Sequence, residues 1–408
     1  MYTRYPAVSS PKFPPFVPQA FPSVDLPLLP TSNPQTGVIP PLTTTLCRTS
    51  FALSLGVLAL SCPLRAQDAR QQLDRQVAAL EKRINSGPDS NENWKEEKPN
   101  LLKTLTIARD NLAAGRTFLG LAQLSFVGPD LTGLENLAGN PEIVKSGVPG
   151  FEQEWKRRNL QLADYGKRYA SIRWDGKPAA LRAIAEASWV ETRALLEASR
   201  PYAAATQIQY GLYYLGRSQG NADYAFFCQG LNLKAQKPAP RYRSLAPEIE
   251  VLQSRVITAY QPPASIEHHS EFIQINAAIK TAKELDAAQL YFGSLYKYLE
   301  GVRLFAMLDA KSPEAADASK LAADSAEFRR TLADAEADAS IGEIFLERAE
   351  SAIAGFNTDK SDPSKLKAAR VALETVLPAY LAAVDRPLPA SAPAGHVINV
   401  TLVRWPYT

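Results

Sequence analysis

The sequence predicts an all-α protein made of stacked antiparallel helical hairpins, in a bundle or short solenoid, with one short C-terminal strand or extended tail. Three observations predict this class. From Gln67 onward, apolar residues recur with a period of about 3.6 residues, which marks one face of a helix. The segments between turn residues are rich in Ala, Leu, Glu and Lys, which are strong helix formers. The clearest β-branched run is residues 397–403, which is typical of one strand or of a packed extended tail.

Residues 1–66 differ from the rest of the 408-residue chain, because they hold 12 of its 31 prolines. Proline fixes φ and lacks a backbone N–H, so residues 1–45 are expected to form a disordered extension. Residues 46–66 resemble a secretory signal peptide, in which Arg48 precedes ten apolar residues and cleavage follows Ala66. The apolar run would rise only about 15 Å as a helix, too little to span a membrane. The alternative is a short buried core helix.

The position of this segment, so far along the chain, leaves two further alternatives open. Translation could begin later, with residues 1–45 not translated, at Val38, Leu42 or Leu46. Residues 59–62 also loosely resemble a lipobox, which would anchor an envelope lipoprotein at Cys62. We therefore expect an exported protein, periplasmic or extracellular, with a membrane-anchored lipoprotein as the alternative. Beyond residue 66 only Cys228 remains, so no internal disulfide can form there, and its aromatic neighbours predict a buried, inert thiol.

Residues 67–127 are expected to form an N-terminal helical hairpin. One apolar stripe marks its first helix: Leu73, Val77, Leu80 and Ile84. That helix should end at the Ser-Gly-Pro of residues 86–88, and a polar loop with Trp94 should follow. The second helix is predicted to start after Pro99-Asn100 and to run without a break past Phe118. Residues 128–150 hold repeated Gly and Pro turn pairs, which predict a Gly/Pro loop.

Two helical regions are expected next, residues 151–262 and 263–385, before an extended tail at 386–408. In the first region we expect helices at about 151–173, 177–199, 202–219, 221–235 and 245–260. In the second we expect helices at about 267–286, 287–309, 314–338, 340–356 and 363–384. Their boundaries are set by Gly, Pro and Asn pairs, which end helices.

One segment, residues 210–227, resembles a tetratricopeptide helix pair. The resemblance covers about 30 residues and rests on Leu215-Gly216, on a turn at Gly220-Asn221 and on Ala225 in the opposing helix. It implies a concave surface that binds a protein or peptide. The 34-residue repeat does not continue, because a shift of that length places Ile249-Glu250 over Leu215-Gly216. The alternative is that the small residues let two helices approach closely.

No catalytic, cofactor-binding or metal-ligating residue is assigned from the sequence, and no cofactor is expected. The cluster at residues 267–271 holds His268 and His269, but adjacent residues on a helix point about 100° apart and cannot easily bind one ion. We expect it to cap a helix, with Ser265 or Ser270 at the N-cap. The chain has no P-loop or dinucleotide motif. An enzyme remains the alternative: a helical hydrolase whose carboxylates converge only in the fold.

The remaining observations concern possible partners. An aromatic stripe is expected to be mostly core, with part of it free to line a cleft: Tyr291, Phe292, Leu295, Tyr296, Tyr298, Leu299 and Phe305. The basic run 156–158 beside Trp155 is expected to form a solvated helix face. Residues 1–66 carry four basic side chains and one acidic one, which accounts for the whole net charge of +3. The rest of the chain is neutral, which argues against nucleic acid. We expect an exported, non-catalytic helical scaffold that presents a protein- or peptide-binding surface.

Overall fold

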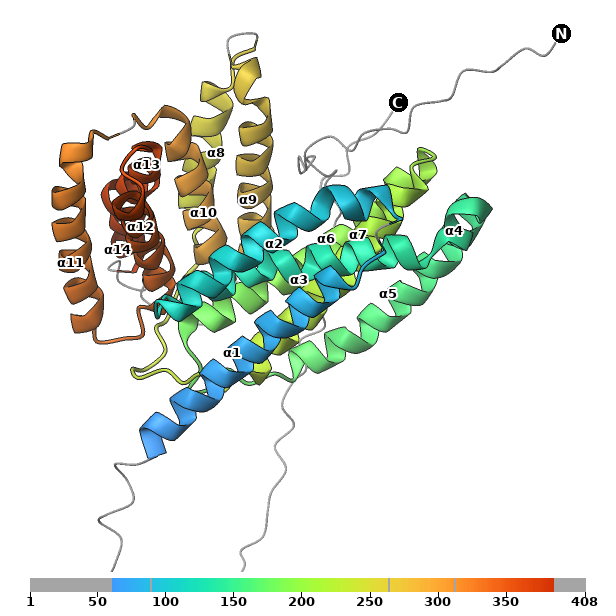
Figure 1. The fold of residues 1–408 in the computed structure, drawn as a ribbon, viewed down its shortest axis with the longest axis horizontal. Coiled ribbons are helices and arrows are strands. Elements are labelled where there is room, and N and C mark those ends of the chain that lie inside the picture. The colour runs from blue at the N-terminus through green and yellow to red at the C-terminus, as the bar shows by residue number, and fades with distance from the viewer. Residues whose placement is uncertain (1–60, 89, 263–264, 312, 385–408) are drawn as a thin grey trace, which may run out of the picture.

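The structure, a computed structural model, describes residues 61–88, 90–262, 265–311 and 313–384, with side chains from Asp68 onward. The all-α prediction is confirmed: over these residues the chain forms helices and no strand (Figure 1). Several predictions lie outside the described residues: the extension 1–45, most of the predicted signal peptide, the strand at 397–403 and the tail 386–408. None of the described helices combines the length and apolarity that a membrane crossing requires.

The helices of the first half are α1 (Ser61–Asn85), α2 (Glu92–Ala113), α3 (Thr117–Gly139), α4 (Pro141–Ser146), α5 (Val148–Ala170), α6 (Ala179–Ala204) and α7 (Ile208–Gly230). Those of the second half are α8 (Ala246–Ala259), the 3-10 turn η1 (Ile266–His268), α9 (His269–Ala287), α10 (Tyr291–Asp309), the 3-10 turn η2 (Ala315–Asp317), α11 (Ala318–Asp334), α12 (Ser340–Thr358), α13 (Ser364–Val371), the π-helical turn η3 (Ala372–Val376) and α14 (Leu377–Val384).

Three helical hairpins, α2–α3, α6–α7 and α9–α10, turn in the same way. One residue at each turn has a left-handed backbone: Gly115 (φ 79°), Thr206 (φ 64°) and Gln289 (φ 59°). In each hairpin the N–H of the next residue donates to the carbonyl five residues earlier, at 2.8–2.9 Å, which is the Schellman closure of a helix. Two alanines precede each turn residue. The turn at Gly115 was not predicted, because α2 and α3 were expected to form one helix.

The hairpins stack in a row, which confirms the predicted stacking of helix pairs. Helix α3 packs against α7, α6 packs against α10, and α8 lies beside α9 at the far end (Figure 1). Helix α12 crosses the row, since it contacts both α3 and α6. Helices α11 and α13 pack against α12. Helices α4 and α5 pack against the α6–α7 hairpin: α5 contacts both α6 and α7, and α4 contacts α7. The central hairpin α6–α7 therefore contacts α3, α4, α5, α9, α10 and α12.

The predicted Gly/Pro loop at 128–150 is wrong, because α3 continues to Gly139 and α4 and α5 begin soon after. The turn predicted at Gly220-Asn221 is also wrong, because α7 runs through it. The physical reason is close packing between α3 and α7. A Cβ on Gly216 would lie 2.5 Å from the carbonyl oxygen of Thr132, and one on Gly220 would lie 2.6 Å from the Cα of Pro129. These glycines permit close helix approach, and the segment that resembles a tetratricopeptide pair is one continuous helix.

The N-terminal hairpin also differs from its prediction. Helix α2 begins at Glu92 rather than after Pro99, so Trp94 lies in a helix and not in a polar loop. The Trp94 ring is buried and its Nε1 donates to the carbonyl of Ile84 at 3.3 Å. Gly87 makes this possible, since a Cβ there would lie 1.6 Å from the ring. In α6, Pro201 was predicted to end the helix but lies inside it, three residues before its end.

The predicted core is confirmed where its residues are described. The stripe of α1 is buried, and so are five members of the α10 stripe: Phe292, Leu295, Tyr296, Leu299 and Phe305. Cys228 is buried and unbridged, and burial raises the pKa of its thiol to about 12, so it is the inert thiol that was expected. The segment predicted as one helix at 363–384 is interrupted by the π-helical turn η3.

Candidate functional site

Besides Asp338, which accepts the N–H of Ala179 in α6 at 2.6 Å, two buried carboxylates bind the first turns of helices in other parts of the row. Glu347 of α12 accepts the backbone N–H of Leu119 in α3 at 2.7 Å. Glu186 of α6 accepts the N–H of Gly293 in α10 at the same distance. Leu119 and Gly293 each follow their left-handed turn residue by four positions. Both carboxylates satisfy N–H groups that a helix leaves unpaired at its start. They hold the stack together and are not arranged around a cavity.

A second set of charges, half-buried except for the buried Arg217, lies between the helices. Asp130 pairs with Arg217 at 2.8 Å, and burial raises the pKa of Asp130 although Arg217 opposes the rise. Burial alone would raise the pKa of Glu300, but Arg303 and Arg348 lie at 2.8 and 3.1 Å and together lower it to about 2. These carboxylates are compensated by arginines and join α3 to α7 and α10 to α12. This set is also structural.

The histidine cluster does not form a metal centre in the structure. Among the described residues, no three His, Cys, Asp or Glu side chains lie close enough together to hold a metal ion. His269 Nδ1 lies 2.9 Å from the hydroxyl of Tyr260, and His268 lies 3.6 Å from Glu267. Ser265 occupies the N-cap of η1, which confirms its predicted position, although its side chain makes no capping hydrogen bond.

The basic run on α5 is partly solvated, as expected, but Arg158 is not. Lys156 and Arg157 are exposed, whereas Arg158 is half-buried and pairs with Glu154 at 2.8 Å. Arg158 also donates to Asn136 of α3 at 3.1 Å. The run therefore helps to attach α5 to the row.

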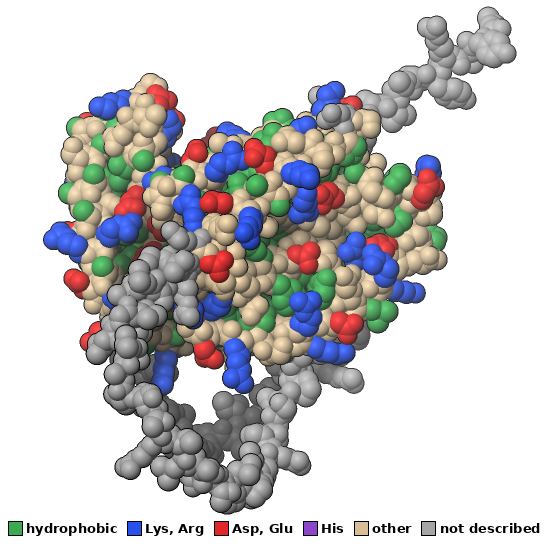
Figure 2. All heavy atoms as spheres, turned by 60° about the horizontal axis from the view of Figure 1, so that its bottom comes forward, with side chains coloured by type: hydrophobic (Ala, Val, Ile, Leu, Met, Phe, Trp, Pro, Cys, Tyr) green, Lys and Arg blue, Asp and Glu red, His purple; other side chains and the backbone are tan. Residues whose placement is uncertain are grey.

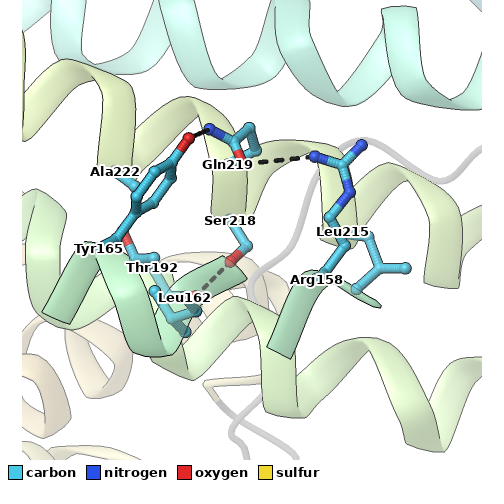
Figure 3. A pocket seen from close by; sticks show the side chains of 8 residues that line it. All are labelled: Arg158, Leu162, Tyr165, Thr192, Leu215, Ser218, Gln219 and Ala222. Atoms are coloured by element: carbon cyan, nitrogen blue, oxygen red, sulfur yellow. Dashed lines mark hydrogen bonds between the residues drawn. The ribbon is translucent and has the colours of Figure 1, made fainter. Parts of the chain in front are cut away.

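A small polar cavity lies beside Arg158, between α5, α6 and α7 (Figure 3). Gln219 stands at its centre: its amide donates to Tyr165 at 3.0 Å, and its carbonyl accepts from Arg158 at 3.3 Å. Ser218 donates to the carbonyl of Thr192 at 2.6 Å. The cavity volume is about 10 Å³, which is room for about one water molecule and not for an organic substrate.

A larger groove lies between α11 and the C-terminal helices, with a volume of about 380 Å³. Its lining residues come from α11, η3 and α14: Asp324, Glu327, Phe328, Thr331, Leu373, Glu374 and Leu381. Leu373 is buried and forms the floor, while Phe328 and Leu381 are half-buried at the sides. The volume is at the lower end of the range of about 300–1,000 Å³ that is common for ligand pockets.

The groove combines an apolar floor with an acidic rim. Glu327, Thr331 and Glu374 are exposed along its edge. Glu374 belongs to η3, and π-helical turns occur often at functional sites because they change the direction of side chains locally. None of the described residues that line the groove is a Lys or Arg. This arrangement can receive an apolar group together with a positive charge, and it is our candidate functional site.

Sequence reasoning missed this groove, although one signal was present. Its four α11 residues, at positions 324, 327, 328 and 331, have the spacing i, i+3, i+4, i+7 and so share one helix face. The partner surface on η3 and α14 depends on how the chain folds back, which no local pattern predicts.

On the face seen in Figure 2, Lys and Arg side chains are interspersed with Asp and Glu over the described helices. No protein-family model, curated protein or solved structure matches the chain.

Proposed function

We propose that this protein is an exported, non-catalytic helical scaffold that binds a protein or peptide segment in the groove between α11 and α14. The groove itself is the observation that carries this proposal: it has the volume for a few side chains, an apolar floor and an exposed rim. The stacked hairpins supply a rigid support, because helix starts and buried charges are paired across the row.

Export is proposed from the predicted signal peptide. Among the side chains described in α1, burial begins at Ala69. Cleavage after Ala66 would therefore remove none of the α1 residues that are described as buried. N-terminal sequencing of the native protein tests this: a mature end near residue 67 is expected, and recovery of Met1 would contradict it. Membrane fractionation that changes on Cys62→Ser would instead favour the lipoprotein alternative.

Peptide binding is tested by selecting a displayed library of random peptides on the purified full chain. We expect enriched peptides to bind the wild-type chain and to lose binding to Thr331→Trp, in which an indole fills the groove. Thr331 is exposed and its hydroxyl donates only to the carbonyl of Glu327, so the fold should tolerate the change.

The matched control is Thr106→Trp. Thr106 is also exposed, lies inside α2, and donates to the carbonyl four residues earlier. Enriched peptides should bind this control as they bind the wild type. Peptides that lose binding equally to both variants, or a selection that enriches none, would contradict the proposed function.

A further inference from the structure

The charge on the groove points to one kind of occupant. We infer that the partner presents a segment in which a lysine or arginine is flanked by apolar residues. This inference rests on the proposed function, since it specifies what the groove between α11 and α14 binds.

The first step is the state of the carboxylates on α11. Within the described part of the chain, neither Asp324 nor Glu327 has an ion-pair partner. Glu374 is 3.7 Å from Arg370, whose guanidinium makes a closer contact, 2.7 Å, with Asp317. The rim therefore carries two uncompensated negative charges and a third that is only weakly paired. A positive partner side chain would neutralise them, whereas a negative one would be repelled.

The second step is the apolar surface between those charges. Phe328 lies next to Glu327 in the chain and is half-buried, as is Leu381 across the groove. A lysine or arginine has a long aliphatic stem that packs on such surfaces while its charge stays at the rim. A cation near the face of an aromatic ring is also attracted by the negative charge of that face. Apolar neighbours in the partner would cover the rest of the floor.

The third step is size. A volume of about 380 Å³ accommodates a few side chains and not a folded domain. An extended segment or one helix face, inserted at a single point, fits this volume. The expected interaction is accordingly modest in affinity and sensitive to salt, because its charges are solvent-exposed.

The probes are two synthetic nine-residue peptides, labelled with a fluorophore, in which leucines alternate either with lysines or with glutamates. Fluorescence anisotropy with the full chain should give at least about tenfold tighter binding of the lysine peptide at low salt. The variants Asp324→Asn and Glu327→Gln should each weaken it about threefold, and Glu327→Lys should reverse the preference. The control Glu96→Gln removes an exposed charge from α2 and should leave binding unchanged.

The outcomes separate this inference from the proposed function. If peptides bind in a manner blocked by Thr331→Trp, but the glutamate or an uncharged leucine peptide binds as tightly as the lysine one, the inference is overturned and the proposed function stands. If the lysine peptide binds equally to the wild type and to Thr331→Trp, the groove is not its binding site. That result would overturn both this inference and the proposed function. Self-association of the chain that Thr331→Trp abolishes would identify a second copy as the occupant, and would also overturn the inference.

Discussion

Glu186 and Glu347 bind helix starts with the same geometry but in different surroundings. Glu186 is held by Arg182, four residues earlier, at 2.7 Å. In α12 the residue four positions before Glu347 is Glu343, another acid. Burial raises the pKa of both groups, but Arg182 opposes the rise at Glu186. At Glu347 burial and the charge of Glu343 raise the pKa to about 8, although the N–H of Leu119 and the charge of Arg329 oppose the rise. One connection is thus made by a carboxylate with an arginine partner, and the other by a carboxyl that is protonated at pH 7.

This difference shows that α6 and α10 are joined through a carboxylate paired with an arginine, whereas α12 and α3 are joined through a protonated carboxyl. The α12–α3 connection should weaken as its proton is lost, since an ionised carboxylate beside Glu343 and Glu350 is costly in a buried site. Three predictions test this comparison and a fourth compares two hairpin turns; they run from the largest expected effect to the smallest.

The largest effect is expected for Glu186→Ala. The change leaves the N–H of Gly293 and the guanidinium of Arg182 without their buried acceptor. We expect the free energy of unfolding to fall by about 3 kcal/mol, measured by urea denaturation at pH 7. Glu186→Gln keeps an acceptor for the N–H and should lose less. A loss under about 1 kcal/mol for the alanine variant would show that this ion pair does not hold α10.

The second prediction concerns pH. In the folded state Glu347 keeps its proton up to about pH 8, whereas in the unfolded chain an ordinary glutamate releases it near pH 4.3. Its contribution to stability is therefore fully present below about pH 4.3 and is lost as pH rises through about 8. Glu347→Gln stays neutral throughout, so it should gain stability relative to the wild type between those values, on the order of a few kcal/mol in total. Parallel pH profiles of the two proteins in urea denaturation would contradict this.

The third prediction concerns a variant that gives Glu347 the arginine neighbour that Glu186 has. Glu343→Arg places a cation four residues before Glu347, as Arg182 stands before Glu186. It should lower the pKa of Glu347 and raise the free energy of unfolding at pH 8 by about 1 kcal/mol. The double-mutant cycle with Glu347→Gln is the control, because the gain should disappear when no carboxylate is present. An equal gain in both backgrounds would mean that Glu343 acts independently of Glu347.

The smallest effect is expected at the hairpin turns, where Gly115 stands in one hairpin and Thr206 in the next. A β-branched residue is strained in the left-handed region, which glycine occupies readily. Thr206→Gly should therefore stabilise the protein by up to about 1 kcal/mol, and Gly115→Ala should destabilise it by a similar amount. Thermal unfolding of both variants measures the two shifts. A stabilising Gly115→Ala would contradict the interpretation.

Sequence reasoning predicted the helices better than their ends. Apolar periodicity predicted the buried stripe of α1 and the core face of α10, because burial of one face imposes that period. It failed at residues 128–150 and at Gly220, where glycines serve helix contacts rather than turns. A glycine can end a helix or allow a second helix to pack closely against it. Which of the two occurs depends on residues that are far away in the sequence. The turn at Gly115 was missed because it is short: only residues 114–116 separate α2 from α3.

The candidate site was less predictable than the fold. The α11 face could have been found from its spacing, as Phe328 and Thr331 follow Asp324 by four and seven residues. Its significance depends on η3 and α14 lying opposite, and on Arg370 turning toward Asp317. Neither the volume of the groove nor the pairing of its charges is a local property of the sequence.

The most direct test of the groove is site-specific photo-crosslinking in the full chain. A photoreactive amino acid replaces Thr331 in one variant and Thr106 in a second, and each is irradiated with the labelled lysine–leucine peptide. Binding in the groove predicts an adduct from position 331 that an excess of unlabelled peptide removes, and little from position 106. Equal labelling at both positions, or an adduct at 331 that unlabelled peptide does not reduce, would contradict the central claim that this groove binds the partner.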